Sequence, residues 1–253
     1  LHFVEGSPVH AIGSDGQLQT IAHGRHLVLK VRPNAPRRVL LTGHMDTVYP
    51  VDHPFQTSAW RDEDTLNGPG TADMKGGLSL MLEGLLAYER SGPALGYDVI
   101  INSDEETGSL SSAELIAELA QSKLAALTYE PALPGGVMAR ARPGSGNFAA
   151  VISGRSAHAG RNPEDGRNAI VAAADLAQRL HAARREGLSI NPARIEGGSP
   201  NNTVPDLAIL HFNMRPRESA DLLSGQTLIA TAIHEVTALH QVHIDLSGGF
   251  GRP

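Results

Sequence analysis

Residues 39–46 read Val-Leu-Leu-Thr-Gly-His-Met-Asp, a short apolar run followed at once by a histidine and an aspartate. Residues 39–42 contain neither glycine nor proline, which is typical of a buried strand. Because side chains alternate along a strand, His44 and Asp46 are expected on the same side of its carboxyl end. Open α/β sheets place their functional sites at that end. The stretch therefore predicts one strand of an α/β sheet, with a candidate site at its edge.

Strand and helix patterns alternate around this strand. Residues 74–90 form the longest helical pattern, which Gly92-Pro93 ends. One apolar stripe runs along it at helical spacing, made of Leu78, Met81, Leu82, Leu85 and Leu86. Further strands are expected at 27–31, 99–103 and 125–129, and a further helix at 111–121. The alternation predicts an α/β domain over residues 1–142, with a mostly parallel sheet that is incomplete at both ends.

A second pattern begins after residues 131–146, whose proline, glycine and arginine content is typical of a linker. The expected elements are strands at 147–153, 188–195, 207–214 and 242–246, and helices at 168–185 and 226–240. Their order, βαββαβ, favours a ferredoxin-like antiparallel sheet of four strands with two helices. We therefore expect a second domain over residues 143–253.

Composition narrows the function classes. The 253 residues suffice for two domains, and 41% hydrophobic with 19% charged residues is typical of a globular protein. No apolar run approaches the ~20 residues of a membrane span. A net charge of -6, with lysine and arginine only in short pairs, argues against nucleic-acid binding, so small molecules or peptides are the expected partners. Without cysteine, a metal must be held by His, Asp and Glu.

Both ends of the chain are expected to be cut from a longer protein. The sequence opens at Leu1 without a methionine, and it stops at Gly251-Arg252-Pro253 soon after a strand-like run. Residues 1–5 have neither the basic nor the apolar region of a targeting signal. The compartment therefore stays open, with the cytoplasm favoured and a signal peptide before Leu1 still conceivable.

A glycine-rich turn at residues 67–77 carries one carboxylate, Asp73, at the entrance of the long helix. Its ordinary role there is an N-cap. Alternatively, its two oxygens bridge two metal ions while the glycines allow close backbone approach. The order Gly-x-x-x-x-Gly-Lys-Ser/Thr of a phosphate loop does not occur in this turn. His44 is equally ambiguous by itself, because a histidine near an aspartate is more often part of a solvated loop.

Three consecutive acids, residues 104–106, follow directly after the strand expected at 99–103. Adjacent acids at a buried strand end repel one another unless a cation lies among them, so a site is about as plausible as a solvated acidic turn. Because neighbouring residues point in different directions, one carboxylate could bind metal while the next acts as a general base. Glu130, after the strand at 125–129, adds a further acid that alone suggests only a surface residue.

The second domain offers three polar candidates. His158 stands in the small-residue loop Ser156-Ala157-His158-Ala159-Gly160, Asn202 in the turn Asn201-Asn202-Thr203-Val204-Pro205, and Arg215 at a strand end. Taken singly, each is explained by an exposed loop or by ordinary turn chemistry.

Taken in order, these motifs resemble the dinuclear zinc peptidase and deacylase family of glutamate carboxypeptidases, acetylornithine deacetylase, succinyl-diaminopimelate desuccinylase and aminoacylase. The matching stretches are residues 43–48 (GHMDTV), 70–77 (GTADMKGG), 104–108 (DEETG), 130–131 (EP) and 156–160 (SAHAG). The resemblance extends over residues 43–252, most of the chain. The runs MDTVY, DEETGS and the final GRP look most like the glutamate carboxypeptidase branch.

The resemblance implies a role for each candidate. The metal ligands would be His44 and Glu130 on one zinc, Asp73 between the two zincs, and Glu106 on the second. Glu105 would be the general base, and Asp46 would orient the ligand histidine. His158 resembles the lid histidine that, in dimeric members, reaches the partner's site to stabilise an oxyanion. Asn202 and Arg215 resemble lid residues near the substrate, and Arg252 resembles an arginine that grips a substrate carboxylate.

The sequence therefore predicts a zinc-dependent amide hydrolase that releases a C-terminal amino acid, with glutamate favoured. Two Zn²⁺ per subunit are expected, with Co²⁺ as an alternative, and a homodimer through the lid domain. The family closes its second metal shell with a histidine near the C-terminus, which we expect beyond Pro253, so this chain alone should be an incomplete catalyst. Two alternatives stay open: an N-acyl amino-acid deacylase of the acetylornithine or succinyl-diaminopimelate type, and a non-catalytic binding or dimerisation relative.

Overall fold

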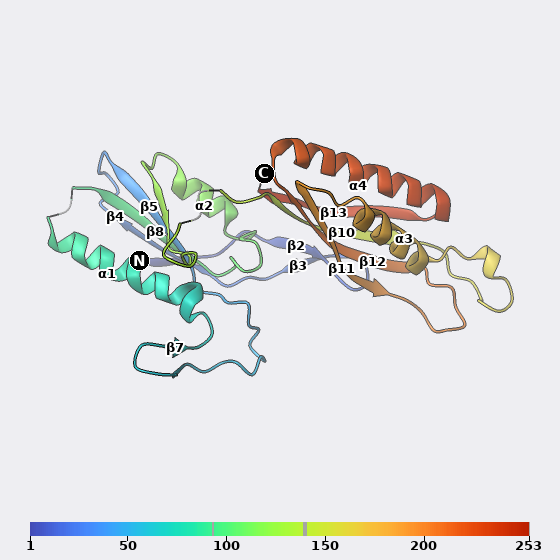
Figure 1. Ribbon diagram of the computed structural model, residues 1–253, viewed down its shortest axis with the longest axis horizontal. Helices are drawn as coiled ribbons and strands as arrows, with labels where there is room; N and C mark the ends of the chain where they lie inside the picture. The colour runs from blue at the N-terminus through green and yellow to red at the C-terminus, as the bar shows by residue number, and fades with distance from the viewer. Residues whose placement is uncertain (93, 139–140, 253) are drawn as a thin grey trace. The chain divides into compact units, whose positions relative to one another are not determined.

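A computed structural model describes residues 1–253 with the exception of Pro93, Ala139, Arg140 and Pro253. The side chain of Arg252 is also outside the described part. The chain forms two compact units (Figure 1). The first comprises Leu1–Val9 and Ile21–Ala139, and the second comprises His10–Thr20 and Arg140–Pro253. Within the described residues, no helix combines the length and the apolar composition that a membrane crossing requires.

The first unit is built on a five-stranded sheet of order β1-β4-β8-β5-β9. Its strands are β1 (His2–Val4), β4 (His26–Val31), β5 (Arg38–His44), β8 (Gly96–Asn102) and β9 (Ala126–Thr128). Strand β5 pairs in parallel with both β8 and β9, which confirms an α/β unit. The carboxyl ends of these three strands therefore meet at one edge of the sheet.

The sheet is mixed, whereas a mostly parallel one was expected. Strand β4 runs antiparallel to β8, and β1 runs antiparallel to β4. The physical reason lies in the connection at residues 32–37, which is far shorter than the dozen or more residues that a parallel crossover needs. The chain therefore reverses between β4 and β5, and only the half of the sheet that carries β5, β8 and β9 is parallel.

Two helices cover this sheet: α1 (Gly76–Arg90) and α2 (Ala113–Ala120). The leucine stripe of α1 is only partly buried, because Met81 is 2% exposed but Leu82 is 58% exposed. Close approach of α1 to the end of β9 requires glycine, since a Cβ on Gly77 would lie 1.9 Å from the carbonyl oxygen of Tyr129. The helix thus begins where the backbone can pack directly against a strand end.

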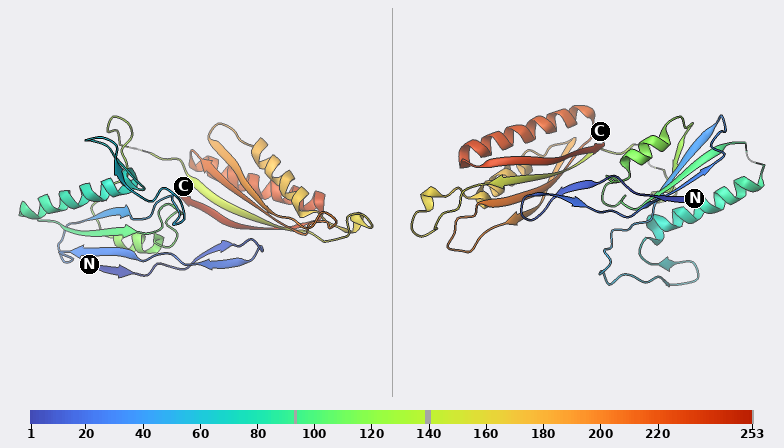
Figure 2. Two further views of the ribbon diagram at one scale, coloured as in Figure 1. Left: turned by 90° about the horizontal axis from the view of Figure 1, so that it is seen from below. Right: turned by 180° about the vertical axis from the view of Figure 1, so that it is seen from behind.

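The second unit has the predicted βαββαβ order and a four-stranded antiparallel sheet of order β11-β12-β10-β13. Its elements are β10 (Ser145–Ser153), α3 (Ala169–Ala182), β11 (Leu188–Gly197), β12 (Leu207–Pro216), α4 (Ser219–His240) and β13 (His243–Arg252). Both helices lie on one face of the sheet (Figure 2) and share its hydrophobic core. The side chain of Asn168 caps α3 by accepting a hydrogen bond from the amide of Val171 (3.1 Å).

Helix α4 begins at Ser219, earlier than the expected residue 226. The residue before the expected start, Gly225, lies inside the helix. A Cβ on Gly225 would meet the sulfur of Met214 at 2.7 Å. The glycine therefore permits close packing of α4 on β12, and it does not end a helix.

Several short elements lie outside the predicted pattern. Strands β2 (Val9–Ile12) and β3 (Leu18–Ile21) form a hairpin, most of which, residues 10–20, belongs to the second unit. A small ribbon of β6 (Ala59–Trp60) and β7 (Leu66–Asn67) interrupts the loop that follows β5. A π-helical turn, η1 (Thr71–Lys75), precedes α1, and a 3₁₀ turn, η2 (Pro163–Asp165), precedes α3.

Candidate metal centre

One histidine and five carboxylates converge at the carboxyl edge of the parallel strands. His44 ends β5, and the acids stand in the segments that follow β5, β8 and β9 or in η1: Asp46, Asp73, Glu105, Glu106 and Glu130. Because β5, β8 and β9 run in parallel, segments far apart in sequence leave the sheet at the same edge. The fold thereby brings together all six residues that the sequence singled out in the first unit.

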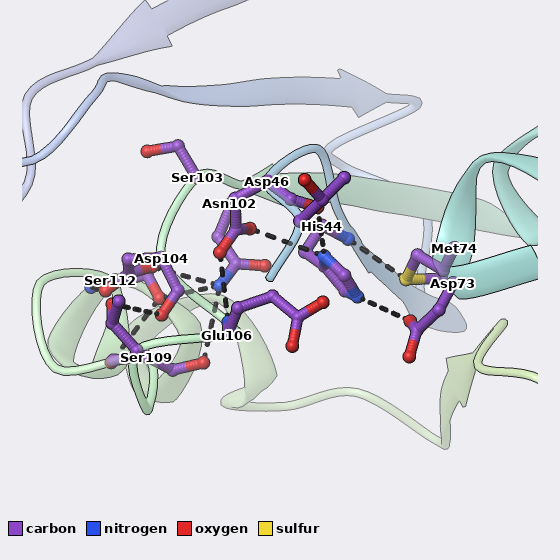
Figure 3. Close-up of polar contacts among 12 residues, drawn as sticks. His44, Asp46, Asp73, Met74, Asn102, Ser103, Asp104, Glu106, Ser109 and Ser112 are labelled. Carbon is purple, nitrogen blue, oxygen red and sulfur yellow. Dashed lines mark hydrogen bonds and ion pairs between the residues drawn. The ribbon is translucent and has the colours of Figure 1, made fainter. Parts of the chain in front are cut away.

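His44 lies at the centre of this group and is 1% exposed (Figure 3). Its Nδ1 lies 3.1 Å from the carbonyl oxygen and 3.3 Å from the carboxylate Oδ1 of Asp46. Both of these are acceptors, so Nδ1 must carry the proton. Its Nε2 lies 3.1 Å from Oδ1 of Asp73 and 3.8 Å from Oε2 of Glu130. A neutral imidazole with its proton on Nδ1 would present the Nε2 lone pair to a cation between these carboxylates.

Donor atoms gather around His44 in two overlapping groups. One is His44, Glu105 and Glu130, and the other is His44, Asp73 and Glu106, with the atoms of each group within 4.8 Å of one another. A histidine nitrogen with carboxylate oxygens is a donor set that Zn²⁺ and related divalent ions accept. The arrangement therefore offers two overlapping sets of metal-ligating atoms around a shared histidine.

The pKa shifts of the clustered groups also favour a bound cation, because the acids are partly buried and repel one another. Burial, and then the charge of Asp73, raise the pKa of Glu106. Burial also raises the pKa of Glu130, with further contributions from Asp73 and Glu105. For His44, burial alone would lower the pKa, but the hydrogen bond to Asp73 and the charges of Glu130 and Asp46 outweigh it and raise the pKa. Positive charge is what this cluster lacks, and a divalent cation would supply it.

The second unit separates its candidates into two places. His158 and Asn202 lie on neighbouring exposed loops, joined by a bridge between His158 and Thr203 and by a hydrogen bond from the amide of Ala159 to the carbonyl of Asn202 (2.9 Å). The segment just before β12 contacts the loop of His158, because the amide of Val204 donates to the carbonyl of Ala157 (2.8 Å). Arg215 lies eight positions further along β12 from its first residue, Leu207, or about 27 Å at the usual strand rise. The structure therefore does not bring Arg215 to the loop of His158.

Arg215 and Arg252 lie toward the same end of the four-stranded sheet of the second unit. Ser145, the first residue of β10, pairs with Arg252, and Gly146 pairs with Met214, the neighbour of Arg215. The side chain of Arg215 is exposed and donates to Oδ1 of Asn213 (3.0 Å). The side chain of Arg252 lies outside the described residues, so its proposed grip on a carboxylate stays a prediction.

Two family models match the chain. The one described as a peptidase dimerisation domain, of the M20 type, matches residues 140–239, and the one described as peptidase family M28 matches residues 26–129. Carboxypeptidase G2 from Pseudomonas sp. (strain RS-16) is 33% identical over 210 residues, which cover 78% of this chain and 49% of that protein. The chain belongs to the M20 peptidase family.

Other relatives of this M20 chain extend the comparison. Acetylornithine deacetylase from Aliivibrio fischeri (strain MJ11) is 24% identical over 257 residues, covering 93% of this chain and 66% of that protein. A tripeptidase structure from Staphylococcus aureus superposes with a TM-score of 0.70 at 25% identity, covering 90% of this chain and 62% of that one. The M20 chain thus spans about half to two thirds of the length of the relatives it matches.

Sequence reasoning missed several residues that shape the site of this M20 chain. The sulfur of Met74, fully buried, lies 3.1 Å from the amide nitrogen of His44. Asn102, Asp104 and Ser112 form a buried polar network beneath the acidic turn (Figure 3). Nothing in the pattern identifies Met74. Asp104 could have been found, because three consecutive acids cannot all face one site.

Proposed function

We propose that the protein containing this M20 chain is a metal-dependent carboxypeptidase that hydrolyses an amide bond and releases a C-terminal glutamate. The observation that carries the proposal is the approach of Asp73 and Glu130 to the Nε2 of a buried His44 whose Nδ1 is held by Asp46. A purely structural histidine, already held at Nδ1 by Asp46, would need no pair of acids at its Nε2.

Two Zn²⁺ ions are the proposed cofactors, with Co²⁺ as a substitute. His44 and Glu130 would hold one ion, Asp73 would lie between the two, and Glu106 would bind the second. When bound, such ions polarise the scissile carbonyl and make water more acidic. The pKa values of Glu106 and Glu130 are raised first by burial and then by like-charged neighbours. Both effects fit this assignment, because a bound cation would favour the ionised carboxylates.

Glu105 is the proposed general base. It is half-buried, and its carboxylate belongs to one donor group with His44 and Glu130. In the reaction, the Glu105 carboxylate would accept a proton from the attacking water and pass it to the departing amine nitrogen. The water oxygen would first bond to the carbonyl carbon, and the C–N bond would break when the tetrahedral adduct collapses, which leaves a carboxylic acid and a free amino acid.

Sequence likeness supports a carboxypeptidase slightly more than a deacylase. The chain is 33% identical to carboxypeptidase G2, 30% identical to a succinyl-diaminopimelate desuccinylase and 24% identical to an acetylornithine deacetylase. Retention of Glu105 beside Glu106 argues against the non-catalytic alternative, because a binding module has no use for a general base. Arg252 would grip the substrate carboxylate by a bidentate contact.

The proposed assembly is a homodimer formed through the second unit, with small molecules or peptides as substrates. The match to a peptidase dimerisation domain over residues 140–239 supports it. His158, exposed on its loop, would act at the partner's site, with Asn202 beside it. Light scattering on the full-length protein tests this assembly, and a monomer at micromolar concentration would contradict it.

One set of assays tests the proposed function. The full-length protein would be offered acyl-glutamate, acetylornithine and succinyl-diaminopimelate side by side, with metal content measured in parallel. Glutamate release, about two zinc ions per chain and loss of activity on chelation are expected. Activity confined to acetylornithine or succinyl-diaminopimelate would replace the carboxypeptidase by a deacylase, and a metal-free, inactive protein would favour the binding module.

A further inference from the structure

Asp104 is a buried acid that the proposed reaction does not use. It is 1% exposed, and its Oδ2 accepts hydrogen bonds from the backbone amides of Ser111 (2.7 Å) and Ser112 (3.1 Å). Its Oδ1 accepts a further bond from the side-chain amide of Asn102 (3.0 Å). Asn102 ends β8, and Ser111 and Ser112 stand just before α2. The carboxylate therefore ties together the two ends of the turn that carries the acids.

The turn between these ends is tightly specified. The amide of Ser109 donates to the carbonyl of Asp104 (2.7 Å), and the amide of Gly108 donates to the carbonyl of Glu105 (2.8 Å). Gly108 and Ser109 both have positive φ values, 102° and 56°. A serine in that region is unfavourable by itself, so the surrounding hydrogen bonds must hold it there. Asn102 lies within 3.4 Å of the Ser109 hydroxyl as well as contacting Asp104.

The side chains of Asp104, Glu105 and Glu106 leave the turn in different directions. Asp104 is buried and lies beside Asn102 and Ser112, whereas the carboxylate of Glu106 extends toward His44 (Figure 3). Glu105 and Glu106 each contribute a carboxylate to a donor group around His44. Sites of this kind work only when their side chains are held to within about 0.5 Å, which requires support from the residues behind them. A shift of the turn would therefore move both acids relative to His44.

We propose that Asp104 is a positioning residue that sets the carboxylates of Glu105 and Glu106 against His44. This inference rests on the proposed function, because it assigns Asp104 a role in metal binding and in proton transfer through its two neighbours. Its three hydrogen bonds come from the turn's own ends, so its effect is local to the turn.

A second buried acid on the same strand provides a matched control. Asp98 is also 1% exposed, lies on β8, and is paired with Arg38 and with Lys123 (Nζ to Oδ2, 3.1 Å). It is opposite Leu40 in the sheet, away from the carboxyl edge. Loss of the Asp98 charge should reduce stability without reaching the acids of the site.

The experiment compares the native full-length protein with Asp104→Asn, Asp98→Asn and Asn102→Ala. Each metal-free protein is titrated with Co²⁺ and followed by visible absorption, and its thermal unfolding is recorded without metal. Asp104→Asn is expected to weaken Co²⁺ binding about 10–100-fold, as loss of support behind a ligand does. Asp98→Asn is expected to bind Co²⁺ with native affinity, even if it lowers the unfolding temperature as much as Asp104→Asn does. Steady-state kinetics of Asp104→Asn should show a fall in kcat with KM little changed.

The outcomes are separable. Equal Co²⁺ affinity in Asp104→Asn and Asp98→Asn, with native protein that binds the ion, would overturn the positioning role alone. Failure of the native protein to bind Co²⁺ would overturn the proposed function and this inference with it. If Asp104→Asn does not fold, Asn102→Ala provides the test. Weaker Co²⁺ binding by Asn102→Ala than by Asp98→Asn supports the positioning role of Asp104, and native Co²⁺ affinity in Asn102→Ala contradicts it.

Discussion

The carboxylate of Asp46 accepts a hydrogen bond from the backbone amide of Glu106 (Oδ2 to N, 2.9 Å), although the two residues are 60 positions apart. The other oxygen of Asp46 lies 3.3 Å from Nδ1 of His44. One side chain therefore connects the histidine that ends β5 with the acidic turn that follows β8. The two candidate ligands keep their spacing because they share this support.

Replacement of Asp46 by alanine should weaken metal binding about 10–100-fold, because the amide of Glu106 loses its hydrogen-bond acceptor and His44 loses the neighbouring carboxylate charge. The backbone carbonyl of residue 46, which accepts from Nδ1 of His44, stays in place in this variant. Isothermal titration of the metal-free full-length protein with Zn²⁺ measures the change. Asp52→Ala, an exposed acid on the loop after the same strand, is the control and should bind as the native protein does. Equal loss in both variants would show that Asp46 acts only through overall charge.

Replacement of Glu105 by glutamine should lower kcat by roughly 10²–10⁴-fold, the usual contribution of a general base, while the zinc content stays native. Glu105 lies in one donor group with His44 and Glu130, so the structure alone also allows it a ligand role. Metal analysis of Glu105→Gln distinguishes the two, because loss of one zinc ion would identify a ligand. Glu118→Gln, an exposed acid on α2, is the matched control and should retain native kcat.

The helix α1 offers a paired test of packing. Gly77→Ala should destabilise the protein by about 1–3 kcal/mol, because its Cβ would lie 1.9 Å from the carbonyl oxygen of Tyr129 and the helix must move. Gly84→Ala, in the same helix with nothing within 4 Å of the added Cβ, should stabilise by roughly 0.5–1 kcal/mol. Urea unfolding of both variants measures the difference, and a similar loss in the two would mean that α1 is not seated against Tyr129.

The sequence was sufficient to predict the βαββαβ order of the second unit, because its strands and helices have buried apolar faces. It did not give every boundary, since α4 begins before the expected residue 226 and β13 continues past the expected residue 246. It was less informative for the first unit. The sheet direction depends on a short connection at residues 32–37, and a hydrophobic pattern does not show strand direction. The hairpin of β2 and β3 could not be predicted from the sequence, because all four residues of β3 are exposed and no apolar alternation marks the strand.

For the candidate metal centre, the sequence supplied residue types and the fold supplied distances. His44, Asp73 and Glu106 were singled out because they end or follow strands, or open a helix, and the parallel order of β5 and β8 brings them together. Contacts made by the backbone were beyond such reasoning. The amide of Glu106 on Asp46, and the amide of His44 near the sulfur of Met74, have no counterpart in any pattern of side chains.

Asp175 links the two helices of the second unit and should make that unit sensitive to acid. Its Oδ2 lies 2.9 Å from Nε2 of His240 on α4, and its Oδ1 accepts from Nε of Arg179 (2.8 Å), which also pairs with Glu235. Burial alone would raise the pKa of Asp175, but the hydrogen bonds from His240 and Arg179 outweigh it and lower the pKa. The carboxylate therefore favours the folded state wherever it is ionised.

The sign of the pH dependence follows from this lowered pKa. Above the unfolded value of about 3.9, Asp175 is charged in both states and its stabilisation is complete. As the pH falls below that value and through the lower folded pKa, the stabilisation is lost. Hydrogen exchange at the amides of α3 and α4 can be followed as the pH is lowered from 5 through the folded pKa of Asp175. Protection should fall more steeply with decreasing pH in the native protein than in Asp175→Asn. Asp165→Asn, a mostly exposed acid of the same unit, should keep the native slope, and an equally steep fall in Asp175→Asn would remove Asp175 as the cause.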